Sequence, residues 1–264
     1  MTLSNVRTKK IGVAGCGALG SIVCRALQDG IEFYDFVGVS DLEEPDFGVP
    51  NMSFSELAEA CDLIVECLPP KVVPTLAKEV LSRDKDIMMI SACALLLSPE
   101  ITEMVEKSKG RITVPSGAIA GLDAISALDF AGIDSATIAT TKHPRGLKGA
   151  PYIKDNNIDL ENIKGNTLIF RGNAIDAAQA FPANVNVAAT LSIAGIGAQN
   201  TMVEVWADPN AQGNCHEITV KGGSSTIKTS VANLPDPSNP KSSMLAGYSL
   251  VAALKKRSDK IVVI

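Results

Sequence analysis

The sequence is poor in aromatic residues and in histidine. Phe, Trp and Tyr make up 4% of its 264 residues, and histidine occurs only at His143 and His216. With so few large rings, the core must be built from small aliphatic side chains, which suit closely packed sheets and helices. The scarcity of histidine also narrows the search for a group that exchanges protons near neutral pH.

Long apolar runs, clustered positive charge and paired cysteines are missing as well. No run of about 18 apolar residues occurs, so a membrane span is not expected. The formal net charge is −5 and the basic residues are scattered, which argues against nucleic-acid binding. The six cysteines form no C-x-x-C pair and no signal-peptide pattern is visible, so we expect a cytoplasmic protein.

Strand-like and helix-like segments alternate through the first third of the chain. This order predicts a doubly wound parallel sheet, the Rossmann type of α/β fold. The expected helices are 18–29, 55–60 (opened by Ser55), 70–82 and 98–107. The expected strands are 10–14, 36–40, 63–67, 86–91 and 111–114.

The pattern changes after Pro115. Strand signals become more frequent and crossover helices fewer, which predicts an α+β domain around a mixed or antiparallel sheet. The expected elements are strands 136–141, 167–171, 202–207 (paired with 217–221) and 225–231, helices 174–181 and 185–194, a proline-rich linker at 233–240 and a last helix at 242–256. We therefore expect domains at 1–115 and 116–238, followed by a C-terminal segment, 239–264.

A glycine-rich turn joins the first expected strand to the first helix. Its sequence, Gly15-Cys16-Gly17-Ala18-Leu19-Gly20, matches G-x-G-x-x-G, whose glycines permit a tight turn, the approach of a diphosphate and close helix packing. Asp41 ends the second strand about 20 residues later, where an acid binds the adenosine ribose and disfavours a 2′-phosphate. These features predict a site for NAD, with NADP possible; a turn that merely connects strand and helix is the alternative.

Two further strand ends are expected to border the cofactor. Ligands of doubly wound sheets bind beyond the carboxyl ends of the strands. Leu68 and Pro69 follow the third expected strand, and Ser91 ends the fourth. Ordinary strand-to-helix loops are the alternative interpretation of these residues.

The second half of the chain holds the candidates for proton transfer and substrate binding. His216 lies where a polar loop runs into a strand, a position from which a side chain can face a cleft. Lys142 could bind a carboxylate, which needs a cation or N–H donors. Asn184 and Asn186 open an alanine-rich helix, as caps or as ligand contacts. A purely structural role is the alternative for each of these residues.

Several longer motifs resemble the L-aspartate dehydrogenase family. Besides the glycine turn, they are residues 115–123 (PSGAIAGLD), 181–189 (FPANVNVAA), 207–217 (which includes ADP and NCHE) and 239–243 (NPKSS). The resemblance covers nearly the whole chain in order. The sequence departs from the family at Lys142-His143-Pro144, where Lys-Pro-Pro is expected, so His143 is a weaker candidate than His216.

The resemblance implies an activity and roles for particular residues. The reaction would be the reversible, NAD(P)-dependent oxidative deamination of L-aspartate to oxaloacetate and ammonia through iminoaspartate, which can feed pyridine nucleotide biosynthesis. His216 would be the catalytic acid or base, and Ala120 and Asn186 would contact the cofactor. The family also implies a homodimer and a C-terminal helix that packs back on the first domain. The candidate substrate contacts are Lys142, Asn184 and Asn214.

Other functions are compatible with this architecture. A semialdehyde dehydrogenase would use Cys93 or Cys215 as its nucleophile. A non-catalytic NAD(H)-binding regulator would bind the coenzyme without turnover, although the chain leaves no residues for an additional partner-binding module. A metal site made of Asp208, Cys215, His216 and Glu217 matches no known ligand spacing, so no metal is expected.

Overall fold

The computed structural model describes residues 8–223, 225–236, 239–257 and 259–263. They form two compact units. The first comprises the described residues of 1–94, 98–115 and 246–264, and the second comprises those of 95–97 and 116–245. No helix in the described part of the chain is long and apolar enough to cross a membrane.

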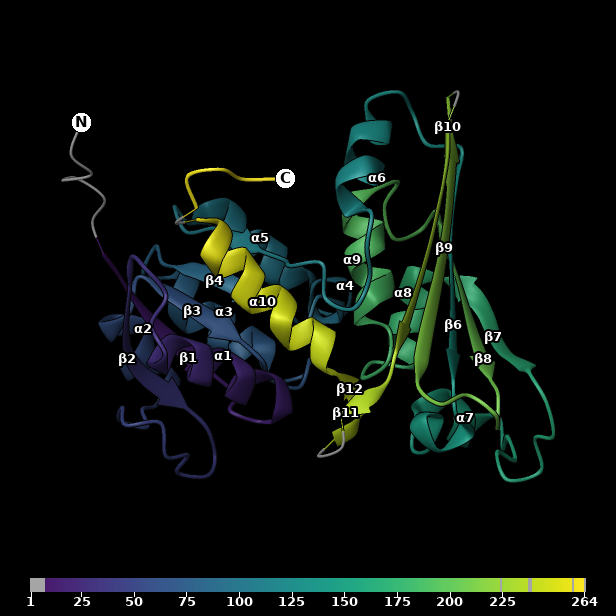
Figure 1. The fold of residues 1–264 in the computed structure, drawn as a ribbon, viewed down its shortest axis with the longest axis horizontal. Helices are drawn as coiled ribbons and strands as arrows, with labels where there is room; N and C mark the ends of the chain where they lie inside the picture. The colour runs from purple at the N-terminus through teal and green to yellow at the C-terminus, as the bar shows by residue number, and fades with distance from the viewer. Residues whose placement is uncertain (1–7, 224, 237–238, 258, 264) are drawn as a thin grey trace. The chain divides into compact units, whose positions relative to one another are not determined.

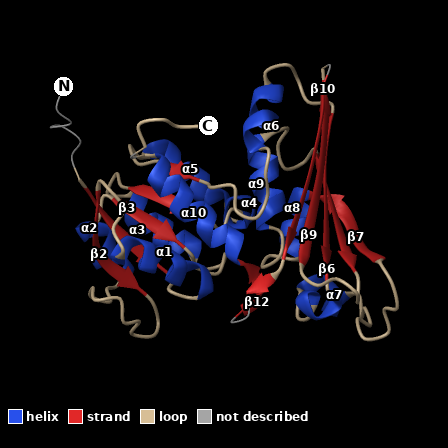
Figure 2. Ribbon diagram, viewed as in Figure 1, coloured by secondary structure: helices blue, strands red, loops and turns tan. Residues whose placement is uncertain are grey.

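The first unit is built around a parallel five-stranded sheet in the order β2-β1-β3-β4-β5. Figure 2 draws strands in red and the helices packed around them in blue. The inner strands are apolar along most of their length, as expected where helices cover both faces of a parallel sheet. The doubly wound fold predicted from the sequence is therefore confirmed. The strands are β1 (Lys9–Ala14), β2 (Tyr34–Ser40), β3 (Leu63–Glu66), β4 (Asp86–Met89) and β5 (Ile112–Thr113).

The last helix of the chain belongs to this first unit (Figure 1). Leu250 and Leu254 of α10 are buried in the same core cluster as Ile11 of β1. Gly247 allows α10 to approach α1 closely, since a Cβ there would stand 2.7 Å from the side chain of Ile22. The predicted return of the C-terminal helix is confirmed. The helices are α1 (Ala18–Gln28), α2 (Phe54–Ala60), α3 (Val73–Leu81), α5 (Pro99–Lys107) and, from residue 246 on, α10 (Met244–Lys256). A further helix, α4 (Cys93–Leu97), is divided between the two units.

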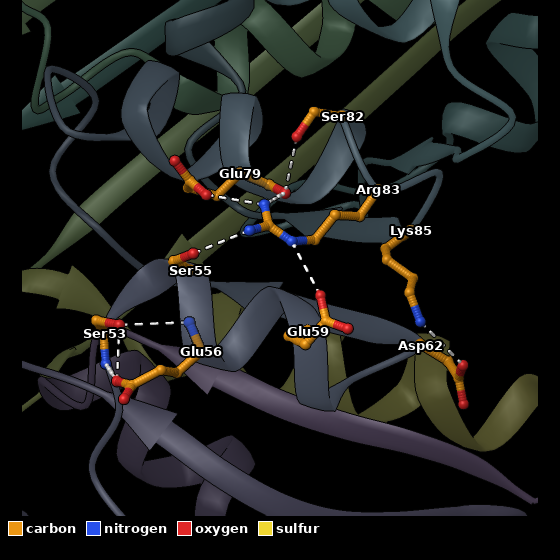
Figure 3. Close-up of polar contacts among 9 residues, drawn as sticks. All are labelled: Ser53, Ser55, Glu56, Glu59, Asp62, Glu79, Ser82, Arg83 and Lys85. Carbon is orange, nitrogen blue, oxygen red and sulfur yellow. Dashed lines mark hydrogen bonds and ion pairs between the residues drawn. The ribbon is translucent and has the colours of Figure 1, made fainter.

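The start of α2 corrects one prediction (Figure 3). Ser53, rather than Ser55, caps the helix: its Oγ accepts from the backbone N–H of Glu56, whose carboxylate accepts from the N–H of Ser53 at 2.9 Å. This reciprocal capping box satisfies two N–H groups at once, which favours the earlier start. The hydroxyl of Ser55 instead accepts from Arg83 at 2.9 Å, and Arg83 also contacts Glu59, so one guanidinium joins α2 to the end of α3.

The second unit contains a mixed sheet in the order β10-β9-β6-β8-β7. Only the β6–β8 pair is parallel among its described pairs. The predicted pairing of 202–207 with 217–221 is wrong because β6 lies between these strands. Alternating burial, which all three strands share, identifies the covered face of a strand but not its neighbours. The strands are β6 (Ser135–Lys142), β7 (Thr167–Asn173), β8 (Thr201–Ala207), β9 (Asn214–Gly222) and β10 (Ser225–Asn233).

Helices cover one face of this second sheet (Figure 1). Alanines of α8 and α9 are buried against it, and their small side chains allow close packing. A ring cluster of Tyr152, Phe170 and Phe181 joins α7, β7 and the end of α8. The helices are α6 (Leu122–Asp129), a 3-10 turn (Pro144–Leu147), α7 (Pro151–Asp155), α8 (Ala174–Ala180) and α9 (Asn186–Ala194).

The expected linker at 233–240 is only partly a linker. Pro235–Asp236 (β11) and Asn239–Ser243 (β12) pair as a small antiparallel ribbon, while residues 237–238 lie outside the described part of the chain. Proline is tolerated in edge strands, where its missing N–H leaves no partner unbonded, so the prolines do not exclude pairing. The last helix accordingly begins at Met244 instead of residue 242.

Candidate active site

The glycine-rich turn lies where the strand order of the first sheet reverses. The chain passes from β1 to β2 on one side and then to β3 on the other, which makes the carboxyl end of β1 a topological switch point. Gly15 follows β1 with a φ of 87° and donates its N–H to the carbonyl of Ser40 at 2.8 Å. A Cβ on Gly15 would stand 2.5 Å from the carbonyl oxygen of Cys67, so both its conformation and its surroundings require glycine.

The other two glycines of the turn differ in what surrounds them. A Cβ on Gly20 would stand 1.8 Å from the carbonyl oxygen of Gly15, so this position needs glycine for packing. A Cβ on Gly17 would meet no atom within 4 Å. Gly17 precedes α1, which has no side-chain cap, so backbone N–H groups near Ala18 and Leu19 are available to an anion. This open, N–H-rich position fits a diphosphate.

Asp41 is fixed beside the glycine turn. Its Oδ2 accepts from the backbone N–H of Cys16 at 2.5 Å, and its Oδ1 accepts from the N–H of Glu43 at 3.3 Å. The amide of Asn51 bonds both the N–H and the carbonyl of Asp41. The acid predicted to bind a ribose therefore lies next to the turn predicted to bind the diphosphate.

The loops after β3 and β4 are joined by a residue that the sequence interpretation missed. Glu66 is fully buried, and its carboxylate accepts from the N–H of Leu68 at 2.5 Å and of Ser91 at 3.1 Å. Ser91 Oγ also donates to the carbonyl of Leu68 at 2.7 Å. Burial raises the pKa of Glu66 to about 7. An acidic residue at the end of an otherwise apolar strand, Leu63–Glu66, is the sequence feature that could have identified Glu66. Pro69 continues the same loop.

The second unit brings together side chains from two neighbouring strands. Thr140 of β6 is paired with His216 of β9, and Thr140 Oγ1 lies 3.0 Å from His216 Nδ1. Lys142 is two residues further along β6, on the same covered face as Thr140. His216 is 3% exposed; this burial and the nearby charge of Lys142 lower its pKa to about 3. The imidazole is therefore neutral at physiological pH.

Lys142 is buried without an acidic partner. Its side chain is 5% exposed, and its Nζ donates to Asn184 Oδ1 at 3.1 Å. The ion pairs found among the described residues do not include Lys142. Burial alone lowers its pKa to about 8. Asn184 thus contacts Lys142 and does not cap α9, which begins two residues later with Val185 as its N-cap.

The remaining candidates lie at different places in the second unit. Asn214 begins β9 and shares the face of His216, two residues away. Asn186 is the first residue of α9 and accepts from the hydroxyl of Thr190 through its carbonyl at 3.0 Å. Ala120 is exposed in the loop before α6, where its carbonyl accepts from Thr229 of β10.

The residues required by the alternative functions are poorly placed for them. Cys93 is fully buried, which raises the pKa of its thiol to about 12. Cys215 is adjacent to His216 within β9, so the two side chains point to opposite faces of the sheet. His143 Nδ1 accepts from the backbone N–H of Arg145 at 3.2 Å and thereby caps the 3-10 turn. Within the described residues, no group of three or more His, Cys, Asp or Glu could bind a metal.

Comparisons with known proteins agree with this arrangement. A model described as "Homoserine dehydrogenase, NAD binding domain" matches residues 15–115, and one described as "Aspartate dehydrogenase, C-terminal" matches residues 123–257. The chain is 42% identical to the L-aspartate dehydrogenase of Methanococcoides burtonii, with 96% of this chain and 98% of that one covered. The chain belongs to the aspartate dehydrogenase family. The family resemblance expected from the motifs is therefore confirmed.

Other relatives support this membership. The L-aspartate dehydrogenase of Methanosarcina barkeri is 40% identical, with 94% of this chain and 96% of the relative covered. The crystal structure of aspartate dehydrogenase from Thermotoga maritima has a TM-score of 0.76 at 24% identity, and the match covers 97% of this chain and 99% of that one. This structural likeness shows that the family fold extends over the whole chain.

We expect the second and third glycines of the turn, Gly17 and Gly20, to respond differently to alanine. Gly17→Ala should keep the free energy of unfolding but weaken NADH binding by about tenfold or more, because its methyl group enters the space for the diphosphate. Gly20→Ala should destabilise the fold, since its Cβ would overlap Gly15. Urea unfolding and NADH fluorescence titration measure the two effects. Gly165→Ala, also in open space, is the control. Unchanged NADH affinity of Gly17→Ala would contradict the assignment.

Lys142→Met should stabilise the folded chain. Methionine removes a buried, uncompensated charge, so the free energy of unfolding at pH 7 should rise by on the order of 1 kcal/mol. The folded-state pKa is lowered from 10.5 to about 8, so the folded protein binds fewer protons than the unfolded one between these values. The advantage of methionine should therefore be largest below pH 8 and decline towards pH 10.5. Urea unfolding across this range measures it; a less stable variant at pH 7 would refute the explanation.

Proposed function

We propose that the chain is an L-aspartate dehydrogenase that uses NAD, with NADP possible. It catalyses the reversible oxidative deamination of L-aspartate to oxaloacetate and ammonia through iminoaspartate, and the iminoaspartate can supply NAD biosynthesis. The observation that carries this proposal is that His216 and Lys142 are buried on one face of a sheet, with Asn184 bonded to Lys142, in a chain that also has a dinucleotide-type glycine turn. The unpaired ammonium of Lys142 could bind a carboxylate of a dicarboxylate substrate.

His216 is proposed as the group that takes a proton from the attacking water or returns it. The nicotinamide supplies the chemistry of hydride transfer. After oxidation of the substrate, water adds to the imine and must lose a proton. A neutral imidazole, held by Thr140 at Nδ1, can accept that proton at Nε2. In the amination direction the same group returns a proton to the departing hydroxyl.

The remaining residues are proposed as binding contacts. Lys142, Asn184 and Asn214 would contact the substrate. Gly17 offers open space at the start of α1, and Asp41 lies beside it, so the first unit fits the diphosphate and ribose of a dinucleotide. The proposed cofactor contacts are Gly15, Gly17, Ala18, Leu19, Gly20, Asp41, Leu68, Pro69, Ser91, Ala120 and Asn186.

We further propose a cytoplasmic homodimer. The second sheet has apolar residues on the face opposite His216, including Leu168 of β7 and Met202 of β8, which are both exposed. Such a face suits a second copy of the chain. The functional division proposed for each copy is 1–115 for the cofactor, 116–238 for catalysis and dimerisation, and 239–264 for the returning segment.

The activity should appear with oxaloacetate and ammonia. NADH absorbance should fall with this pair faster than with other keto acids, and His216→Ala should reduce turnover about 10²-fold or more while NADH affinity is kept. His143→Ala is the matched control and should keep turnover, because its ring only caps a turn. Near-normal turnover of His216→Ala would remove it from the mechanism. Binding of NADH without turnover on any acid would indicate a binding protein instead.

Asp41 should set the choice between the two coenzymes. Asp41→Ala removes the charge that would repel a 2′-phosphate, so the ratio of kcat/KM for NADPH to that for NADH should increase by about tenfold. Asp35→Ala, an exposed acid on the same strand β2, is the control and should leave the ratio unchanged. Equal ratios in wild type and Asp41→Ala would refute this role.

A further inference from the structure

Lys142 lacks the charge that normally accompanies a buried ammonium. The polar partner of its Nζ is the neutral amide oxygen of Asn184 at 3.1 Å, and no carboxylate of the described residues forms an ion pair with it. A buried charge without a partner is unfavourable unless the group releases its proton or an anion arrives. The side chain is therefore suited to change its charge during a reaction.

The surroundings of Lys142 contain one titratable group that interacts with it. This is His216 on the neighbouring strand β9, and each cation would disfavour the other. Asn184 before α9 and Gly146 in the following turn, whose Cβ position lies 3.9 Å from Lys142 Cβ, are neutral. Asp208 donates its backbone N–H to the carbonyl of Lys142 at 2.9 Å, but its carboxylate accepts from the N–H of Asn210 and forms no ion pair with Lys142 among the described residues. With no acid to hold the proton, burial lowers the pKa of Lys142 to about 8, whereas His216 stays neutral above about pH 3.

The proposed reaction needs two proton transfers of different kinds. L-aspartate arrives with a protonated α-amine, which must lose a proton before its lone pair can form the C=N bond. Water must later lose a proton when it adds to that bond. A base works best when its pKa is close to that of its partner, and the lysine amine is much closer to an alkyl amine than a weakly basic buried imidazole is.

Building on the proposed function, we propose that Lys142 is a catalytic residue that takes the α-ammonium proton of L-aspartate and returns it to the departing nitrogen. His216 then accepts only the proton of the attacking water. This assignment goes beyond a carboxylate contact. It divides the two proton transfers between buried side chains on the same face of adjacent strands.

Protons and electrons balance in this scheme. Neutral Lys142 accepts one proton from the substrate ammonium. The nitrogen lone pair forms the C=N bond as the Cα–H bond breaks, and the hydride leaves with its electron pair to the nicotinamide coenzyme that the proposed function supplies. Water adds to carbon while His216 accepts one of its protons. Lys142 then protonates the nitrogen, the C–N bond breaks to release ammonia, and the hydroxyl proton passes to solvent as the C=O bond forms.

Lys142→Arg separates proton transfer from carboxylate binding. Arginine keeps the positive charge and the N–H donors but does not lose its proton. We expect the kcat for L-aspartate deamination to fall about 10²-fold, whereas calorimetry should find succinate, a dicarboxylate without an amine, bound within about tenfold of wild type. Lys148→Arg, an exposed lysine of the same loop, is the control. A Lys142→Arg enzyme with near-normal kcat would overturn the proposal.

The pH dependence of succinate binding provides a readout that does not require turnover, and the pH profile of kcat can be compared with it. Wild-type affinity for succinate should fall as pH rises through about 8, because Lys142 loses its charge, and wild-type kcat for deamination should rise over the same range. In Lys142→Arg both profiles should be flat there. Succinate affinity that declines equally in the variant would contradict the assignment.

A second variant tests whether Lys142→Arg loses activity only because the larger arginine side chain does not fit the site. Lys142→Cys should be inactive until aminoethylation restores an amine, which is more acidic than that of lysine. The pH at which kcat rises should then be lower, with aminoethylated wild type as the control for the native cysteines. Restored activity without that movement would overturn the proposal.

The same assays distinguish failure of the proposed function from failure of the role of Lys142. If wild type itself turns over no oxaloacetate and ammonia, the proposed function fails as well. Wild-type turnover together with an active Lys142→Arg refutes only the role of Lys142.

Discussion

The proposed chemistry of the second unit depends on a buried lysine that forms no ion pair among the described residues. The unit buries Lys142 on the helix-covered face of its sheet, beside His216 and within hydrogen-bond distance of Asn184. Burial lowers the pKa of Lys142 to about 8, and burial together with the charge of Lys142 lowers that of His216 to about 3, so the lysine can change its charge near pH 8 while the imidazole stays neutral. Burial of an unpaired ammonium lowers stability, and we propose that its role in binding an anion and exchanging protons offsets that cost.

In the first unit, the backbone geometry of the glycine turn leaves space for a diphosphate. Its glycine turn leaves open space at Gly17 and fills the space at Gly20, so a diphosphate can approach the start of α1 while the helix stays close to its strand. Glu66 adds a carboxylate that holds the two following loops by their N–H groups. In the proposed coenzyme site, main-chain atoms of the turn and Asp41 would contact the coenzyme, while Glu66 holds the neighbouring loops in place.

Features with local sequence patterns could be predicted, and features that depend on strand neighbours could not. The glycine turn and Asp41 follow from a motif and its spacing, and the alternation of strands and helices gave the doubly wound sheet. The pairing of β6 with β9, which places Thr140 against His216, joins residues far apart in the chain and has no local signature. The contact of Asn184 with Lys142 has the same origin, because asparagine before a helix usually indicates a cap.

The ionisation of Lys142 can be measured directly by NMR of the protein with 13C-labelled lysine, with the signal of Lys142 assigned by its loss in Lys142→Arg. A titration midpoint near pH 8 is the result that this account predicts. A midpoint at the ordinary lysine value of 10.5 would show that the buried amine is held as a permanent cation, and would contradict the account.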